Sequence, residues 1–126
     1  MIVGTGVDLC EVDRMQRALT APHGERLRDR VFTPLEIAYA ERRANRYERY
    51  AARFAAKEAG MKALGTGWRD GIAWQDFEVV NLPSGRPTLR FHGRAAELAA
   101  KMGVTGVALS ITHTREQALA MVILEA

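Results

Sequence analysis

The sequence predicts an α+β fold in which an antiparallel sheet packs against a long helix. Three observations indicate this class. A helical pattern runs from about residue 45 to residue 64, the second half of the chain is rich in β-forming runs, and the turns between paired runs are too short for parallel crossovers. The chain has 126 residues, 48% hydrophobic and 26% charged, so we expect one domain over residues 1–126 with its own core.

The first two expected elements are a strand and a short helix. Residues 1–9, MIVGTGVDL, read as a strand in which Gly4, Gly6 and Asp8 share one side. The two glycines leave room above that side for another part of the structure to approach closely. Residues 11–20 follow as a short helix with apolar residues four positions apart.

Two further helices have clear boundary signals. Thr33 is an expected N-cap, Pro34 suits the first helical position, and Glu36 completes a capping box. The long helix over residues 45–64 follows, and Gly65 is placed to end it.

The second half of the chain predicts two antiparallel hairpins. Residues 76–82 and 87–91 flank a PSGR turn, and residues 104–112 and 118–124 flank a second short connection. Residues 93–103 form a short helix between the hairpins. A second apolar element must cover one face of the sheet, and the sequence leaves open whether this is a helix or another subunit.

The long helix places charged residues where its apolar stripe should continue. The stripe recurs at helical spacing over Tyr47, Tyr50, Phe54, Met61 and Leu64. Lys57 and Glu58 occupy the position between Phe54 and Met61, and a core-facing charge is costly unless it is paired or bound. The simpler alternative is that Glu58 and Lys62 form an exposed i,i+4 pair.

Asp8 and Glu58 are candidate ligands for Mg²⁺. This ion binds through one or two carboxylates, water and substrate phosphates, so one carboxylate from the strand and one from the helix would suit it. The alternative for Asp8 is a strand-end acid that caps a turn. The two GTG segments complete neither a P-loop nor a dinucleotide fingerprint, so the acids indicate phosphate chemistry without a nucleotide motif.

The charge distribution favours an anionic partner. The formal net charge is +3, but ten arginines stand against five acids between Arg14 and Arg53. Such a block suits nucleic acid, a phosphorylated cofactor or an acidic protein, and it can equally be a solvated helix face.

Other features exclude several classes of protein. Cys10 is the only cysteine, so no disulfide forms within the chain and a cytoplasmic location is expected. The three histidines lack zinc-ligand spacing. No stretch approaches 18 apolar residues and no signal segment opens the chain, so neither membrane spanning nor secretion is expected.

Several motifs occur together in a recognisable order. GTGVDLCEVDR opens the chain, FTPLE follows, and RFAAKEAGMKALGTG forms a long gapless central motif, with DFEV, SGRP and SITHT after it. In these segments the chain resembles the holo-acyl-carrier-protein synthase family of small 4′-phosphopantetheinyl transferases along essentially its whole length. Gly60 and Ser84 depart from the family pattern, which often has a larger apolar residue and an asparagine there.

The resemblance implies an activity and a 4′-phosphopantetheinyl transferase-like fold. The family transfers the 4′-phosphopantetheine arm of coenzyme A to a serine of apo-acyl carrier protein, releases 3′,5′-ADP, and so supports fatty acid biosynthesis. Asp8 and Glu58 match its Mg²⁺ ligands. Lys62 would contact a phosphate or help the serine lose its proton, and the resemblance does not decide between these roles. The family is a homotrimer with active sites shared between adjacent subunits.

The resemblance also implies binding residues. Those expected to bind coenzyme A are Arg53, Phe54, Lys57, Lys62, Gly65, Ser84, Gly85, Arg86, Pro87, Ser110, Thr112 and His113. Those expected to dock the acidic carrier protein are Arg14, Arg17 and Arg28, through electrostatic steering. The competing interpretation is a non-catalytic basic module that binds nucleic acid through residues 14–53. It has no recognised motif and leaves Asp8 and Glu58 unexplained, so neither a nucleic acid nor a membrane is an expected partner.

Overall fold

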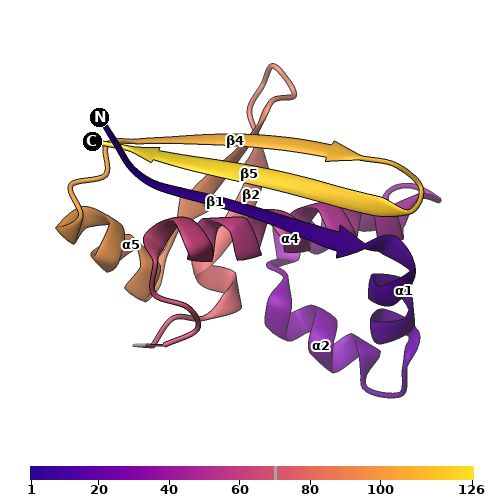
Figure 1. Cartoon of the computed structure of the whole chain (residues 1–126). Coiled ribbons are helices and arrows are strands. Elements are labelled where there is room, and N and C mark those ends of the chain that lie inside the picture. The colour runs from indigo at the N-terminus through magenta and orange to yellow at the C-terminus, as the bar shows by residue number, and fades with distance from the viewer. Residues whose placement is uncertain (70) are drawn as a thin grey trace.

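The computed structural model describes residues 1–69 and 71–126, and it confirms the α+β class. Helix α4 (Arg46–Leu64) crosses the centre of the molecule, and an antiparallel sheet lies over one side of it (Figure 1). This sheet has the strand order β1-β5-β4, formed by β1 (Ile2–Glu11), β5 (Gln117–Glu125) and β4 (Gly106–His113).

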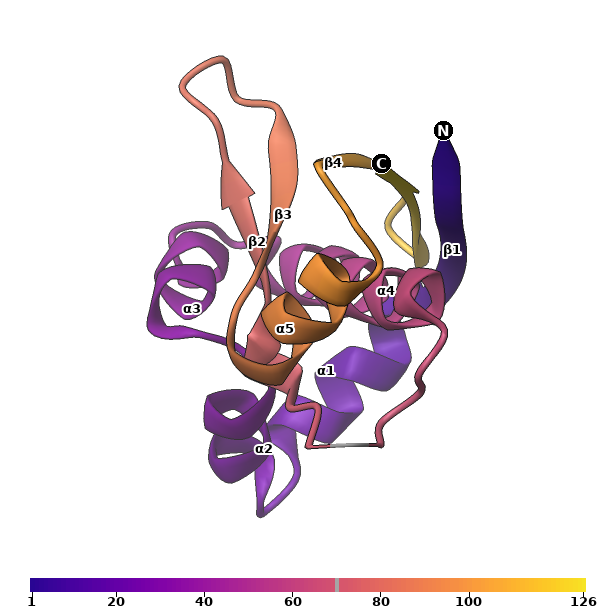
Figure 2. The same cartoon turned by 90° about the vertical axis from the view of Figure 1, so that its left-hand side faces the viewer.

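The remaining elements surround the rest of α4 (Figure 2). Strands β2 (Phe77–Asn81) and β3 (Pro87–Phe91) pair with each other as a separate two-stranded sheet, so the predicted sheet is divided into two. The other elements are α1 (Val12–Thr20), α2 (Gly24–Val31), α3 (Pro34–Glu41), a short 3₁₀-helix η1 (Trp74–Asp76) and α5 (Gly93–Lys101).

Local signals in the sequence are confirmed at several element ends. The Thr33 backbone N–H donates to Glu36 Oε1 at 2.9 Å and the Glu36 N–H donates to Thr33 Oγ1 at 3.3 Å, which is the predicted capping box. Gly65 ends α4 in the left-handed region, with φ of 77°. The sequence did not predict α2, because only Leu27 and Val31 of its GERLRDRV segment are apolar and most of the other residues are charged.

The glycines of β1 allow direct contact between the strand and α4. A Cβ atom at Gly4 would lie 2.1 Å from the carbonyl oxygen of Ala63, and one at Gly6 would lie 1.9 Å from that of Ala59. Helix α4 therefore occupies the space that the two glycines leave free. It is the element that covers this face of the sheet. Asp8 follows on the same strand, two residues after Gly6.

Replacing Gly6 with alanine is expected to destabilise the fold, because a methyl group cannot share space with a backbone carbonyl oxygen. The backbone must shift, and such overpacking costs about 1–3 kcal/mol of unfolding free energy. Urea titration followed by circular dichroism measures this cost. Gly106→Ala is the matched control, since a Cβ atom there meets its nearest neighbour at 3.8 Å. Equal stability of the two variants would contradict the packing argument.

The opposite side of α4 is also buried. Tyr50, Met61 and Leu64 of the predicted stripe are all less than 9% exposed. At Gly60 a Cβ atom would lie 2.6 Å from Leu89 Cδ2, so the structure explains why this chain has glycine in the middle of a helix. The alanines of α4 complete the buried surface, which leaves little of the helix in contact with solvent.

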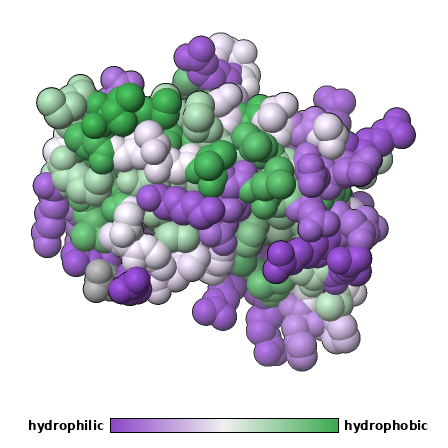
Figure 3. All heavy atoms as spheres, in the orientation of Figure 1, coloured by the Kyte–Doolittle hydropathy of each residue, from purple (hydrophilic) through white to green (hydrophobic). Residues whose placement is uncertain are grey.

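The outer face of the three-stranded sheet is apolar and exposed in the single chain. Val7 and Leu9 of β1 alternate with the residues that face α4, and they pair in register with Met121 and Leu119 of β5. These four side chains are 38–52% exposed. Figure 3 shows apolar atoms along the surface over β1 and β5. Within the described residues, no helix combines the length and low polarity needed to cross a bilayer.

Candidate active site

Asp8, Glu58 and Lys62 line one cavity of about 690 Å³. Asp8 lies near the end of β1, and Glu58 and Lys62 lie one helical turn apart on α4. The close contact between β1 and α4 brings the three side chains together from two distant parts of the sequence. This is the arrangement that the candidate metal site requires.

Lys62 makes an ion pair with Asp8. Its Nζ atom lies 3.0 Å from Asp8 Oδ1 and also donates to the Val7 carbonyl oxygen at 3.1 Å. Lys62 therefore pairs with Asp8 of the strand, and the alternative of an exposed Glu58–Lys62 pair does not form. The ion pair places a positive charge at the edge of the cavity beside the two acids.

Glu58 is held in an unfavourable electrostatic position. Burial raises the pKa of Glu58, the nearby charge of Asp8 raises it further, and Lys62 opposes both effects. Among the described residues, the Glu58 carboxylate accepts no hydrogen bond and forms no ion pair. A carboxylate in this state is a ready ligand for a cation.

The donor set fits Mg²⁺. Two carboxylates from separate elements face one cavity, and within the described chain no group of three or more histidine, cysteine or acidic residues forms a complete metal cage. Mg²⁺ takes one or two protein carboxylates and completes its shell with water and substrate phosphates. The site is suited to this ion and lacks the ligand count of an all-protein calcium or zinc site.

The remaining walls of the cavity are largely apolar. Phe54 and Trp74 stack with ring centroids 5.0 Å apart on one wall, and Arg14 and Arg30 stand at the rim. Cys10 also lines the cavity. Burial, followed by the charge of Asp8, raises the pKa of the Cys10 thiol to about 11, so it stays protonated and is not a nucleophile at neutral pH.

A second group of predicted residues lies elsewhere. Arg86, Pro87 and Ser110 line a separate cavity of about 500 Å³ between the β2–β3 hairpin and β4. Ser84 and Gly85 belong to the same exposed turn, with Gly85 at a φ of 90°. No described residue lines both cavities. Gly65 and Thr112 line neither of the two.

Arg53, Lys57 and His113 are also outside both cavities. The Arg53 guanidinium lies 3.8 Å from the centre of the Tyr39 ring, and burial lowers the pKa of Arg53. His113 Nδ1 lies 3.4 Å from Glu48 Oε1. Lys57 is completely buried and its Nζ atom lies 2.7 Å from Glu36 Oε1, so the core-facing charge of the sequence has a buried partner.

The predicted docking arginines differ in their surroundings. Arg14 lines the cavity of the acid pair and forms no ion pair among the described residues. Arg17 pairs with Asp13 on α1, and Arg28 pairs with Asp29 at 3.0 Å. Sequence reasoning missed Trp74, which belongs to no pattern with a chemical meaning, and it did not single out Arg30 among the ten arginines of residues 14–53.

Comparison with known proteins shows the family of the chain. The family model described as the 4′-phosphopantetheinyl transferase superfamily matches residues 4–122. The chain belongs to the 4′-phosphopantetheinyl transferase superfamily. A curated relative from Solibacter usitatus, named holo-[acyl-carrier-protein] synthase, is 65% identical over 125 residues, which is 99% of each chain. By this similarity the chain is an enzyme of the holo-[acyl-carrier-protein] synthase type.

Solved structures confirm the fold. The holo-[acyl-carrier-protein] synthase of Neisseria meningitidis is similar with a TM-score of 0.87 and 31% identity, covering 100% of both chains. The Bacillus anthracis enzyme, solved in complex with CoA (3′,5′-ADP), has a TM-score of 0.80 and 35% identity, covering 100% of this chain and 98% of that one.

Proposed function

We propose that the chain transfers the 4′-phosphopantetheine arm of coenzyme A to a serine of apo-acyl carrier protein, with Mg²⁺ held by Asp8 and Glu58. The products are the holo-carrier protein, which serves fatty acid biosynthesis, and 3′,5′-ADP. The observation that carries the proposal is the convergence of Asp8, Glu58 and Lys62 in one cavity. A nucleic-acid-binding module would leave these three residues without a role. The single free cysteine suits the reducing cytoplasm.

The chemistry is a phosphoryl transfer that depends on placement and charge. The serine oxygen forms a bond to the β-phosphorus of coenzyme A, and the bond from that phosphorus to the bridging oxygen breaks. The bridging oxygen departs with 3′,5′-ADP, and the serine proton passes to solvent water. When bound, Mg²⁺ supplies positive charge to the diphosphate oxygens. Asp8 and Glu58 would hold this ion, because carboxylates repel a diphosphate and act on it only through a cation. Lys62 is an ammonium ion in its pair with Asp8, which suits it to hold a phosphate oxygen.

The binding residues divide between two surfaces. Phe54 stands beside Glu58 in the acid cavity, whereas Arg86, Pro87 and Ser110 line the other cavity, next to Ser84 and Gly85 of the same turn. Coenzyme A therefore bridges the acids of one subunit and the turn of a neighbour, in a homotrimer with shared sites. The exposed apolar face of Val7, Leu9, Leu119 and Met121 supports such an assembly. Arg53, Gly65, Thr112 and His113 remain proposed contacts of coenzyme A.

Arg14, Arg17 and Arg28 are the proposed contacts of the acidic carrier protein. Arg14 has the strongest support because it stands in the wall of the acid cavity, where the carrier serine must arrive. Its charge is not neutralised by any described acid within ion-pair distance. Steering by such charges raises the association rate more than the final affinity.

The proposal is tested by mixing the chain with coenzyme A, Mg²⁺ and an apo-acyl carrier protein. Mass spectrometry of the carrier should show the addition of one phosphopantetheine group, and chromatography should show an equal amount of 3′,5′-ADP. Chelation with EDTA should stop the reaction and added Mg²⁺ should restore it. A carrier whose acceptor serine is replaced by alanine is the control. Absence of the adduct with several carrier proteins would reject the function.

The proposed trimer makes a separate prediction. Met121→Glu places a charge in the centre of the exposed apolar face, so we expect monomers by light scattering and a large loss of transfer activity. The matched control is Leu35→Glu on α3, which changes an exposed leucine outside both the sheet and the two cavities. A trimer that survives Met121→Glu would contradict the assembly through this face.

A further inference from the structure

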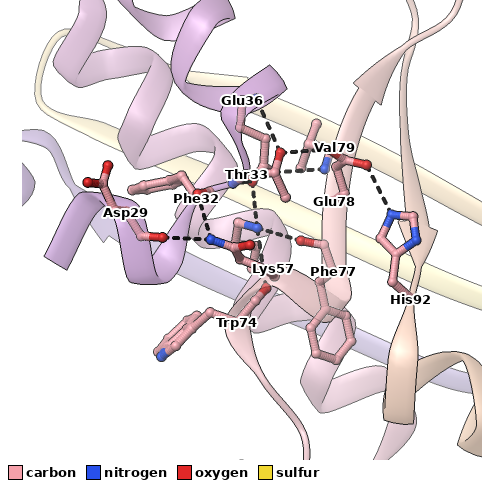
Figure 4. A network of polar contacts seen from close by, with 11 residues as sticks. Asp29, Phe32, Thr33, Glu36, Lys57, Trp74, Phe77, Glu78, Val79 and His92 are labelled. Carbon is pink, nitrogen blue, oxygen red and sulfur yellow. Dashed lines mark hydrogen bonds and ion pairs between the residues drawn. The ribbon is translucent and has the colours of Figure 1, made fainter. Parts of the chain in front are cut away.

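Lys57 is the centre of a buried polar network (Figure 4). Its ammonium group is 0% exposed and lies 2.7 Å from Glu36 Oε1. It also donates to the carbonyl oxygens of Phe77 and, at 3.3 Å, of Trp74. All of its described partners are thus inside the chain, and Lys57 lines neither of the two cavities described above.

Glu36 joins three elements at the same point. Its Oε1 atom accepts the backbone N–H of Thr33 at the start of α3, and its Oε2 atom accepts the N–H of Val79 in β2 at 2.8 Å. Together with Lys57 on α4, these bonds tie α3, β2 and α4 through one fully buried carboxylate. An ion pair of this kind holds its elements firmly, because separating the charges in a dry core is costly.

The network also fixes the wall of the acid cavity. Lys57 holds the backbone of Trp74, whose ring stacks on Phe54 beside Glu58. The next residue, Gln75, donates from its side chain to the carbonyl oxygens of Asp29 at 2.6 Å and Phe32 at 3.0 Å. The segment of residues 74–77 is therefore clamped between α4 and the end of α2, both of which border the cavity.

Lys57 also contributes to the rotational setting of α4. Successive residues of a helix point about 100° apart, so anchoring Lys57 to Glu36 restricts the direction in which Glu58 leaves the helix. The contacts of Gly4 with Ala63 and of Gly6 with Ala59 set how near α4 lies to β1. The buried ion pair adds a restraint on the side of the helix that faces α3 and β2.

We propose that Lys57 and Glu36 are positioning residues for the transfer reaction, acting by holding Glu58 and the Trp74 wall in place. This inference rests on the proposed function. It differs from the role that the family resemblance implies for Lys57, which is direct contact with a phosphate of coenzyme A. Complete burial against three internal partners, Glu36, Trp74 and Phe77, favours the positioning role.

The test compares Glu36→Gln and Lys57→Met in a Trp68→Phe background. The chain has two tryptophans, so Trp74 is then the only one and its fluorescence reports on the wall. We expect stronger quenching of Trp74 by acrylamide in both variants. We also expect kcat per folded molecule to fall by about 10–100-fold with the KM for coenzyme A nearly unchanged, since small misplacements at a reacting site cost this much. The double variant should lose no more than either single one.

Two exposed positions on α5 provide matched controls. Glu97→Gln and Lys101→Met make the same changes on the exposed face of α5, and neither should alter the quenching of Trp74. A raised KM for coenzyme A in Lys57→Met alone would overturn the proposal in favour of phosphate contact. An unchanged kcat per folded molecule would overturn it in favour of a structural role alone.

Two measurements keep the inference testable by itself. The quenching of Trp74 requires no substrate, so it reports on positioning even if the unaltered chain fails to modify a carrier protein, a result that would reject the proposed function. If Lys57→Met and Glu36→Gln do not fold, Trp74→Ala in the unaltered background replaces them. It removes the stacked wall and leaves the network in place, so we expect a similar fall in kcat, and an unchanged kcat would overturn the proposal.

Discussion

Asp8→Ala and Glu58→Ala are each expected to lower the transfer rate by on the order of 10³-fold, because a metal ion contributes several kcal/mol of charge stabilisation and each ~1.4 kcal/mol is tenfold. The rate is measured by the mass assay of the carrier protein over a range of Mg²⁺ concentrations. Excess Mg²⁺ should rescue the activity only in part. Transfer at the unaltered rate in either variant would reject the assignment of these acids as metal ligands.

The same substitutions should leave the fold intact. Glu58 has a raised pKa, so its carboxylate is less stable in the folded chain than in the unfolded chain at neutral pH. Its contribution to stability is present below the unfolded pKa and is lost as the pH rises through the folded pKa. Glu58→Gln should therefore unfold at the same or a slightly higher temperature at pH 7. Glu97→Ala, an exposed acid on α5, is the control for both rate and stability.

Glu36→Gln and Lys57→Met are each expected to lower the unfolding free energy by about 3–5 kcal/mol, because each leaves its partner's charge buried without compensation. Both side chains are 0% exposed in the ion pair. The double variant Glu36→Gln/Lys57→Met removes both charges, so its loss should be smaller than the sum of the single losses.

Urea titration at constant pH measures these changes. The comparison is with the exposed Arg94–Glu97 pair, whose charges are solvated, and Glu97→Gln should cost no more than about 1 kcal/mol. A loss of this small size in the Glu36 and Lys57 variants would mean that water reaches the pair and that the network is not a dry core contact.

Much of the local structure could be predicted from short-range chemistry. The capping box at Thr33 and Glu36, the left-handed Gly65 and the PSGR hairpin depend on residues near one another in the sequence, and all three are confirmed. Helix α2 was not predicted because its eight residues include only two apolar side chains, Leu27 and Val31, against five charged ones. The division into two sheets also could not be predicted from the sequence, because it depends on which strands pair with partners far away along the chain.

The candidate site was likewise predictable only in part. The position of Asp8 beside glycines indicated a close approach, and the structure shows that α4 makes it. The charge of Lys57 at a core-facing position indicated that this side chain needs a partner. The sequence indicated Glu36 only as a capping residue, so the ion pair between the two was not predicted. The separation of the two cavities could not be predicted, because spacing along the chain does not reveal which distant residues fold onto the same cavity.

The direct contact between β1 and α4 has a consequence for how the active site responds to sequence change. Glycine and alanine side chains have no rotamers, so no layer of adjustable side chains lies between the two backbones there. The distance between the backbones of β1 and α4 is thus insensitive to repacking of apolar side chains elsewhere in the interior. Conservative substitutions among distant apolar residues can therefore lower the unfolding temperature while the turnover rate at moderate temperature stays the same. The contact between β1 and α4 acts as a rigid part of the scaffold.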